Sequence, residues 1–118
     1  LGEGKFYMQI KQYKEAIEQK FQFTPYYGTL NIQVDAFALK EFLSQKKRIK
    51  IDGFLTSERT YGGIFCYPVK IKKQKKIVAG ALIIPERTNH PENVAELIAP
   101  VYLRDVLSLK DDDIIEVE

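Results

Sequence analysis

The chain has 118 residues, of which 45% are hydrophobic and 29% charged, and this length suits a single domain over residues 1–118 with one hydrophobic core. The composition excludes intrinsic disorder as the default, and a single cysteine, Cys66, excludes an internal disulfide and a cysteine-based metal cluster. The longest apolar run, from Ile77 to Ile84, is far shorter than the roughly 18 residues of a membrane-spanning helix. We therefore expect a globular domain in the cytoplasm that has no contact with a membrane.

The net charge of +2 conceals an uneven distribution of charged residues. Residues 1–85 carry 15 lysine and arginine residues against 7 acidic ones, whereas residues 86–118 carry 3 against 9. A basic body favours a phosphate-bearing partner, which can be a nucleotide or a nucleic acid. Much of the excess lies in two lysine-rich runs, at 46–50 and 70–76, and such short runs are most often solvated turns.

The first half of the chain predicts two strands and two helices. Alternating apolar residues predict a strand over 5–10, and apolar residues at helical spacing predict an amphipathic helix over 12–21. A second alternating segment predicts a strand over 29–34. Asp35 can cap a short helix over 36–43.

The second half is rich in short strands. We predict them at 48–55, 64–71, 77–84, 94–98 and 114–117. Asp52-Gly53 is a possible tight turn, and Pro68 suggests a sheet edge or a bulge. A basic hairpin turn over 72–76 and one or two helical turns over 101–107 complete the pattern. Many short strands with glycine and proline between them favour a small barrel over a β-α-β sheet.

The inventory of catalytic side chains is small. The single histidine, His90, lies far in sequence from Cys66, and no nucleophile elbow, HExxH motif or P-loop occurs. This argues against hydrolytic and zinc chemistry. Phosphoryl transfer remains open, because it depends on positioning and charge stabilisation more than on covalent catalysis.

Two short segments could bind an anion and a metal ion. Gly2-Glu3-Gly4-Lys5 can direct backbone N–H groups at an anion, although such a tetrapeptide is more often an ordinary turn. Thr29 and Asn31 share one face of their strand and offer two neutral oxygens about 7 Å apart along the backbone. Mg²⁺ bound mainly through substrate phosphates needs only one or two such oxygens, but the pair is also compatible with a solvated strand face.

Two later segments carry polar groups that could recognise a substrate. Residues 85–91 form a loop dense in hydrogen-bonding side chains between two prolines, which suits recognition or an ordinary polar loop. Glu96 alternates with the apolar Leu97 on its strand, and Arg104 can reach a phosphate, although each alone would more often be a surface charge. Asp111-Asp112-Asp113 is interpreted as a turn and not as a metal cluster.

The order and spacing of these segments resemble the CTP-dependent riboflavin kinases of archaeal type. The resemblance runs along almost the whole chain, on Leu1 to Tyr7, Pro25 to Asn31, Tyr67-Pro68, Pro85 to His90 and Glu96 to Asp105. It implies a mainly β fold, a compact six-stranded cradle-loop β-barrel with a few short helices. It also implies transfer of the γ-phosphate of CTP to the 5′-hydroxyl of riboflavin, giving FMN and CDP with Mg²⁺ as cofactor.

The resemblance assigns a role to each matching position. The nucleotide would be bound by Leu1, Gly2, Glu3, Gly4, Lys5 and Phe6 on one side and by Val101, Tyr102, Leu103 and Arg104 on the other. Mg²⁺ would be held by Thr29 and Asn31, and the flavin by Thr88 and Glu96. Glu96 could accept the proton of the ribityl hydroxyl or only bind that hydroxyl.

Two other functions stay open at this stage. One is a basic barrel that binds nucleic acid, and the other is a barrel that binds flavin or nucleotide without turnover.

Since the family has a strand before the glycine-rich loop, we expect this chain, which starts at Leu1, to lack that strand. Some relatives also carry a preceding DNA-binding domain. For the domain itself we expect a monomer that binds no nucleic acid.

Overall fold

The computed structural model describes residues 10–86 and 92–118. In chain order, the elements are α2 (Lys11–Phe21), β1 (Leu30–Gln33), α3 (Ala36–Ser44), β2 (Ile49–Ile51), β3 (Phe54–Leu55), β4 (Thr60–Tyr61), β5 (Ile64–Lys73), β6 (Lys76–Pro85), β7 (Val94–Ile98), α4 (Leu103–Val106) and β8 (Glu116–Val117). The predicted strand over 5–10 lies outside the described residues, apart from Ile10.

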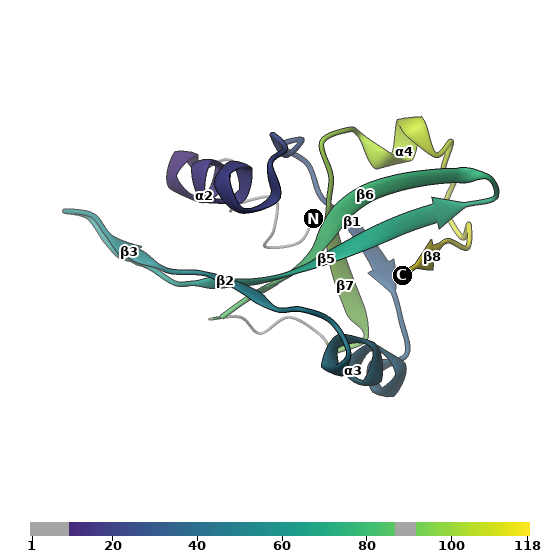
Figure 1. Cartoon of the computed structure of the whole chain (residues 1–118), viewed down its shortest axis with the longest axis horizontal. Coiled ribbons are helices and arrows are strands. Elements are labelled where there is room, and N and C mark those ends of the chain that lie inside the picture. Colours follow the sequence, from purple (N-terminus) through teal and green to yellow (C-terminus); the bar gives the residue numbers. More distant parts are fainter. Residues whose placement is uncertain (1–9, 87–91) are drawn as a thin grey trace.

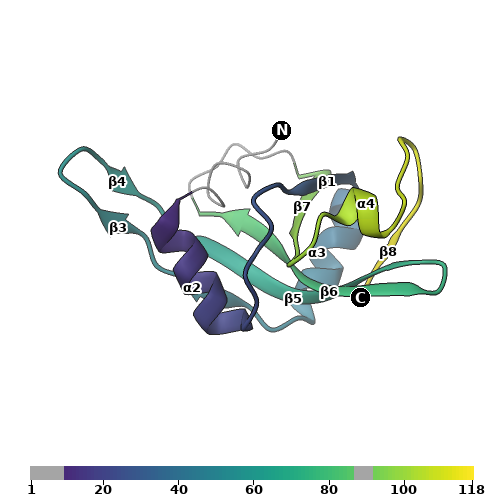
Figure 2. The same ribbon diagram turned by 90° about the horizontal axis from the view of Figure 1, so that it is seen from above.

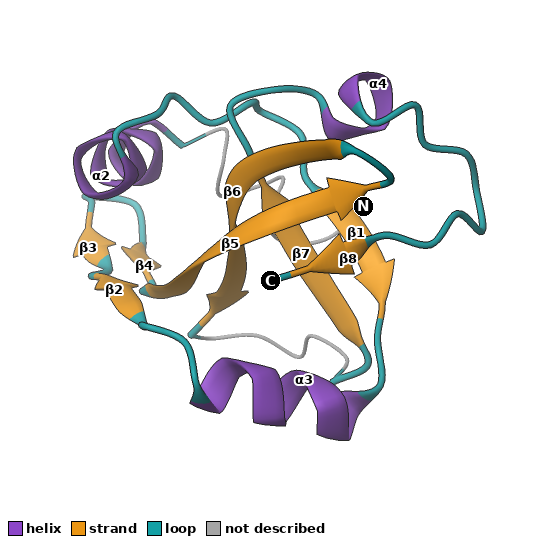
Figure 3. Cartoon of the chain, turned by 45° about the vertical axis from the view of Figure 1, so that its right-hand side comes forward, coloured by secondary structure: helices purple, strands orange, loops and turns teal. Residues whose placement is uncertain are grey.

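Six strands form one antiparallel sheet in the order β1-β7-β6-β5-β2, with β8 pairing with β5. The long β5–β6 hairpin is its centre, and the sheet curls strongly into a half-barrel (Figure 1, Figure 3). This confirms the predicted mainly β, barrel-like fold with a few short helices.

The sheet has an apolar core on each face. On one face, Tyr13 and Ile17 of α2 pack against Ile64, Cys66 and Ile83. On the other face, a second cluster contains Leu30, Tyr67, Leu82, Leu97, Leu103 and Leu107, with partly buried side chains of α3 packed against it. Accordingly, α2 and α3 lie on opposite sides of the sheet (Figure 1, Figure 2).

Both predicted helices form for the reasons that the sequence suggests. The two buried residues of α2, Tyr13 and Ile17, lie one helical turn apart, so one face of the helix enters the core. Helix α3 begins after Asp35, whose side chain accepts a hydrogen bond from the backbone N–H of Ala38 at 2.8 Å. The capping prediction is confirmed.

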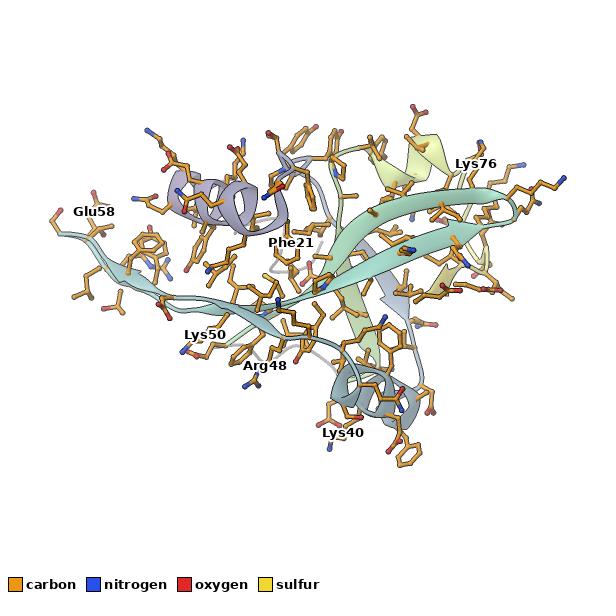
Figure 4. All side chains as sticks on the ribbon, in the orientation of Figure 1. Phe21, Lys40, Arg48, Lys50, Glu58 and Lys76 are labelled. Carbon is orange, nitrogen blue, oxygen red and sulfur yellow. The ribbon has the colours of Figure 1, made fainter. Side chains whose placement is uncertain are left out.

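The predicted tight turn at Asp52-Gly53 is wrong. Strand β2 runs on into β3, and the chain reverses only after Leu55, where Thr56 N–H donates to the carbonyl of Arg59 at 2.9 Å. Glu58 lies near the far end of this hairpin (Figure 4). Gly53 instead permits a close approach, because a Cβ there would lie 2.1 Å from the carbonyl oxygen of Tyr61.

Pro68 lies within β5 without breaking it. Its partner on β6 is Ala81, while β2 pairs with β5 only up to Cys66 and β8 only from Ile71. Lys70, two residues on, exchanges backbone hydrogen bonds with Glu118 on the side away from β6. Pro68 points its nitrogen to that same side, where no strand of the described residues pairs with it, so β5 has a local edge at this position, which is one of the two predicted alternatives.

Cys66 packs as a small apolar residue, as predicted. Its side chain is fully buried, and this burial raises the pKa of the thiol to about 12. The thiol is therefore neutral at physiological pH.

Candidate functional site

The segments that carry most of the predicted site run side by side. Strand β1 pairs antiparallel with β7, which places Leu30 opposite Leu97 and Asn31 opposite Glu96. The pairing continues beyond the strands, since the backbone N–H of Tyr26 donates to the carbonyl of Ala99 at 2.7 Å. Residues 26–31 thus lie along residues 96–99. This pairing brings Thr29 into contact with Glu96, which is 67 positions away in the chain.

Glu96 and Thr29 are in direct contact. The hydroxyl of Thr29 donates a hydrogen bond to Oε2 of Glu96 at 3.1 Å. Glu96 is fully buried, and it is the one charged side chain in the core among the residues that the structure describes. Burying a carboxylate is costly unless it is hydrogen-bonded, and such groups are frequent at functional sites. The strand alternation that separates Glu96 from Leu97 therefore directs the carboxylate toward the predicted metal pair.

The oxygens at this site suit a hard divalent cation. Asn31 lies opposite Glu96 in the register, and Thr29 shares the strand face of Asn31. Because the Thr29 hydroxyl gives its hydrogen to Glu96, its lone pairs remain available to a cation, as is common for ligands oriented by a neighbour. Amide, hydroxyl and carboxylate oxygens are ligands that Mg²⁺ accepts. In the described part of the chain, no group of three or more His, Cys, Asp or Glu residues could hold a metal.

Arg104 lies on the same cavity as Asn31. The cavity beside β1 has a volume of about 950 Å³, and its lining includes Asn31, Arg104 and the acidic turn 111–113. The guanidinium of Arg104 pairs with Oδ1 of Asp111 at 3.3 Å, and the Arg104 side chain is about half exposed. An exposed ion pair contributes little stability, so a phosphate can compete for this arginine. The sequence did not predict the contact with Asp111.

The whole chain, residues 1–118, matches the family model of the CTP-dependent riboflavin kinases, which is described as "Domain of unknown function DUF120". The chain belongs to this family.

Curated relatives in this family are archaeal proteins named riboflavin kinase. The Pyrobaculum aerophilum protein is 50% identical over 120 residues, which cover all of this chain and 55% of the relative. The Methanosarcina acetivorans protein is 44% identical over 115 residues, covering 96% of this chain and 47% of the relative. The Archaeoglobus fulgidus protein is 38% identical over 120 residues, covering all of this chain and 50% of the relative. The chain spans about half the length of the curated relatives it matches.

The structure brings together some of the residues that the riboflavin kinase resemblance assigns. Thr29, Asn31 and Glu96 form one group on the β1–β7 pair, and Arg104 reaches the cavity that Asn31 lines. Leu103 is buried in the core, so any contact of this residue with a ligand falls to its backbone. Of the remaining predicted positions, Tyr102 is 49% exposed and Val101 packs partly buried against the core cluster that contains Leu103, while Leu1 to Phe6 and Thr88 lie outside the described residues.

Three lysines of the 70–76 run are engaged by the acidic C-terminal part of the chain. Lys72 pairs with Glu118 at 2.6 Å and Lys73 with Asp113 at 2.9 Å, while Lys76 donates to the carbonyl of Val106 at 3.2 Å. Figure 4 shows Lys76 near the end of the β5–β6 hairpin, beside α4. This run therefore ties the hairpin to the C-terminal segment, which weakens the interpretation of a nucleic-acid-binding face.

The acidic run 111–113 lies in the predicted turn. Asp113 accepts a hydrogen bond from the backbone N–H of Lys110 at 2.8 Å, and Asp112 has a positive φ of 71°.

In the described part of the chain, no helix is long and apolar enough to span a membrane.

Proposed function

We propose that this protein is a Mg²⁺-dependent kinase that transfers the γ-phosphate of CTP to the 5′-hydroxyl of riboflavin, producing FMN and CDP. Membership of the family supports the reaction class, and its name supports the donor. The observation that carries the proposal is the buried Glu96 carboxylate, hydrogen-bonded to Thr29 and opposite Asn31.

In the proposed reaction, the ribityl oxygen forms a bond to the γ-phosphorus while the bond from that phosphorus to the β–γ bridging oxygen breaks. CDP leaves with the bridging oxygen, and the proton of the ribityl hydroxyl passes to Glu96 or to water. Such transition states are loose, so positioning and charge stabilisation matter more than a strong base. When bound, Mg²⁺ would neutralise charge on the phosphates beside Thr29 and Asn31.

The chain's own residues would position the two substrates. Glu96 accepts a hydrogen bond from the ribityl hydroxyl, and Thr29 holds the carboxylate in place through the bond it donates. Arg104 leaves Asp111 and pairs with a phosphate oxygen of the nucleotide. Its positive charge then offsets the negative charge that develops as the bond between the γ-phosphorus and the bridging oxygen breaks. Binding both reactants in line supplies most of the acceleration.

The test is product formation by the purified protein with riboflavin, Mg²⁺ and either CTP or ATP, followed by chromatography of the flavins. FMN with CTP and none with ATP supports the proposal. Flavin and nucleotide binding without any FMN would show a binding protein, and salt-sensitive binding to DNA or RNA without FMN would show a nucleic-acid-binding barrel.

Variants of β1 make the test specific for the site. Asn31→Ala should lower turnover by at least about tenfold at limiting Mg²⁺, because a ligand beside the phosphates is lost. Gln33→Ala is the matched control, since Gln33 is an exposed amide two residues farther along the same strand. The Glu96→Gln variant separates two roles for Glu96: retained turnover shows that it only binds the hydroxyl, and a loss confined to kcat shows that it takes the proton.

A further inference from the structure

Helix α3 is apolar but poorly buried. Every residue of this helix except Lys40, Glu41 and Ser44 is apolar, and none of its side chains is fully buried. Phe37, near the start of the helix, is 72% exposed. A helix that is apolar on nearly all sides is normally covered by other parts of a protein. Part of the α3 surface is therefore available to a partner.

A groove runs between α3 and the sheet. Its volume is about 410 Å³, which lies within the range of cavities that hold ligands. Its apolar lining includes Phe37 and Leu43 of α3, Ile84 of β6 and Ala95 of β7. Among the described residues of the lining, the polar ones are Lys40 and Glu92. The groove is thus an apolar surface with a few charges at its border.

The groove and the reacting groups of the proposed function lie on opposite faces of the sheet. Ala95 and Leu97 belong to the apolar cluster that α3 covers, and Glu96 between them points to the other face. Ile83, which is the partner of Glu96 in the register, packs in the cluster that contains residues of α2. A molecule in the groove therefore does not cover Glu96 or Thr29, and this inference is independent of the proposed function.

Arg48 borders the groove from the neighbouring strands. Its guanidinium carbon lies 4.5 Å from the centroid of the Phe65 ring, and Phe65 is the partner of Ile84 in the β5–β6 register. An aromatic ring attracts the guanidinium but carries no net charge. The contact therefore orients Arg48 beside the groove and leaves its positive charge available.

Positive charge prevails at the border of the groove. Lys40 is exposed, and neither Lys40 nor Arg48 forms an ion pair with a described carboxylate. Figure 4 shows both residues on the same side of the molecule, on α3 and just before β2. Lys50 adds no net charge, because it is paired with Glu86 at 3.1 Å. The border thus favours an acidic partner.

We propose that this groove binds an acidic amphipathic helix of another protein. Apolar side chains of the helix at positions i, i+3 or i+4, and i+7 enter the groove, and its carboxylates pair with Lys40 and Arg48. The occupant is a helix because the lining offers few polar groups, so a buried segment must satisfy its backbone hydrogen bonds internally. The α3 wall, from Ala36 to Leu43, is about 10 Å long and matches two turns of such a helix.

A second copy of this chain does not supply the helix from its described residues. Helix α2 buries its apolar face in the core, through Tyr13 and Ile17. Helix α4 has four residues, and α3 itself forms the wall of the groove. The partner is therefore a different polypeptide.

The test uses labelled synthetic helical peptides of one design, with leucine at positions i, i+4 and i+7 and either glutamate or lysine at the positions between. Binding to the purified protein is measured by fluorescence anisotropy. The glutamate peptide should bind at least about tenfold more tightly than the lysine peptide, and more weakly as salt is added. A scrambled glutamate peptide, which lacks the leucine stripe, should not bind.

Variants of the border and the wall locate the binding. Phe37→Ala should raise the Kd of the glutamate peptide at least about tenfold. Its matched control is Leu55→Ala, because Leu55 is 76% exposed on the distant strand β3. Lys40→Glu should weaken binding of the glutamate peptide and strengthen binding of the lysine peptide, and Lys75→Glu, in the exposed β5–β6 turn, is the control for charge. All four variants should form FMN like the parent protein.

Several results would overturn the inference. They are no binding of the glutamate peptide, equal binding of the glutamate and lysine peptides, and binding that neither Phe37→Ala nor Lys40→Glu weakens. Binding to vesicles of anionic lipid without binding to the peptide would show a membrane surface instead, and self-association abolished by Phe37→Ala would show an interface between copies. Peptide binding through the groove in a protein that forms no FMN would contradict the proposed function alone.

Discussion

Replacing Thr29 with valine tests whether its hydroxyl stabilises the buried carboxylate of Glu96. Valine keeps the branched shape of threonine and removes only the group that donates to Glu96 at 3.1 Å. A hydrogen bond to a charged group contributes about 1.5–3 kcal/mol to stability, and the full burial of Glu96 prevents water from replacing it. We therefore expect Thr29→Val to lower the free energy of unfolding by about 2 kcal/mol.

Urea unfolding followed by circular dichroism measures this loss. With a urea m-value of about 2 kcal/mol/M, the midpoint should fall by about 1 M without a change of slope. Thr29→Ser keeps the donor and is the matched control, with an expected change below about 0.5 kcal/mol.

A double-mutant cycle with Glu96→Gln shows whether the loss runs through the carboxylate. In the Glu96→Gln background the bond joins two neutral groups, so Thr29→Val should cost only about 1 kcal/mol. Equal costs in the two backgrounds, or a valine variant as stable as the parent protein, would refute the reasoning.

Three further predictions follow from other contacts. Asn31→Ala should raise the Mg²⁺ concentration needed for half-maximal FMN formation by at least about tenfold while leaving the urea midpoint within about 0.5 M, and an unchanged Mg²⁺ titration would contradict the metal assignment. Cys66, whose burial raises its pKa to about 12, should react with a thiol reagent at pH 8 only after unfolding; rapid labelling of the native protein would contradict its burial. The hydrogen bonds from the Lys110 backbone and the Lys73 side chain lower the pKa of Asp113 in the folded protein. The ionised Asp113 therefore stabilises the fold at pH values above its unfolded-state pKa of about 3.9. This stabilisation is lost as the pH falls through the lower folded-state pKa. Thermal melts should therefore show Asp113→Asn less stable than the parent protein at neutral pH and the difference shrinking as the pH falls below about 3.9, whereas a constant difference would exclude this linkage.

Local patterns in the sequence predict most of the elements that the structure describes. Apolar spacing identifies α2, the cap at Asp35 identifies α3, and the alternation around Glu96 identifies β7. These features depend on neighbouring residues, so they can be recognised without knowledge of the fold.

The errors arise where distant residues decide the outcome. Asp52-Gly53 has the composition of a hairpin turn, but Gly53 is required by the close approach of the Tyr61 carbonyl, which sequence spacing does not reveal. The short strand β4 was not predicted, because two residues carry no periodicity. The basic hairpin turn over 72–76 was predicted and forms between β5 and β6, but its ion pairs with Asp113 and Glu118 from the end of the same chain were not predicted.

In the candidate site, too, neighbouring residues indicate the candidates, and contacts between distant residues decide the arrangement. Thr29 and Asn31 share a strand face that suits either a metal ion or solvent, and Glu96 considered alone would more often be a surface charge, so the order of the motifs was needed to favour the site. The antiparallel register of β1 and β7 then brings Asn31 opposite Glu96 and allows the Thr29 bond. The stacking of Tyr26 on Tyr102 also depends on that register, and spacing could not have predicted it.

The central claim is that this chain carries out CTP-dependent phosphorylation of riboflavin with Thr29, Asn31 and Glu96 at the reacting groups. The most direct measurement is FMN formed from riboflavin, Mg²⁺ and CTP by the purified parent protein and by Asn31→Ala and Gln33→Ala, with ATP reactions alongside. We predict FMN from the parent protein and from Gln33→Ala with CTP only, and at least about tenfold less from Asn31→Ala. The claim would be contradicted if the parent protein formed as much FMN with ATP as with CTP, or if Asn31→Ala were fully active at limiting Mg²⁺.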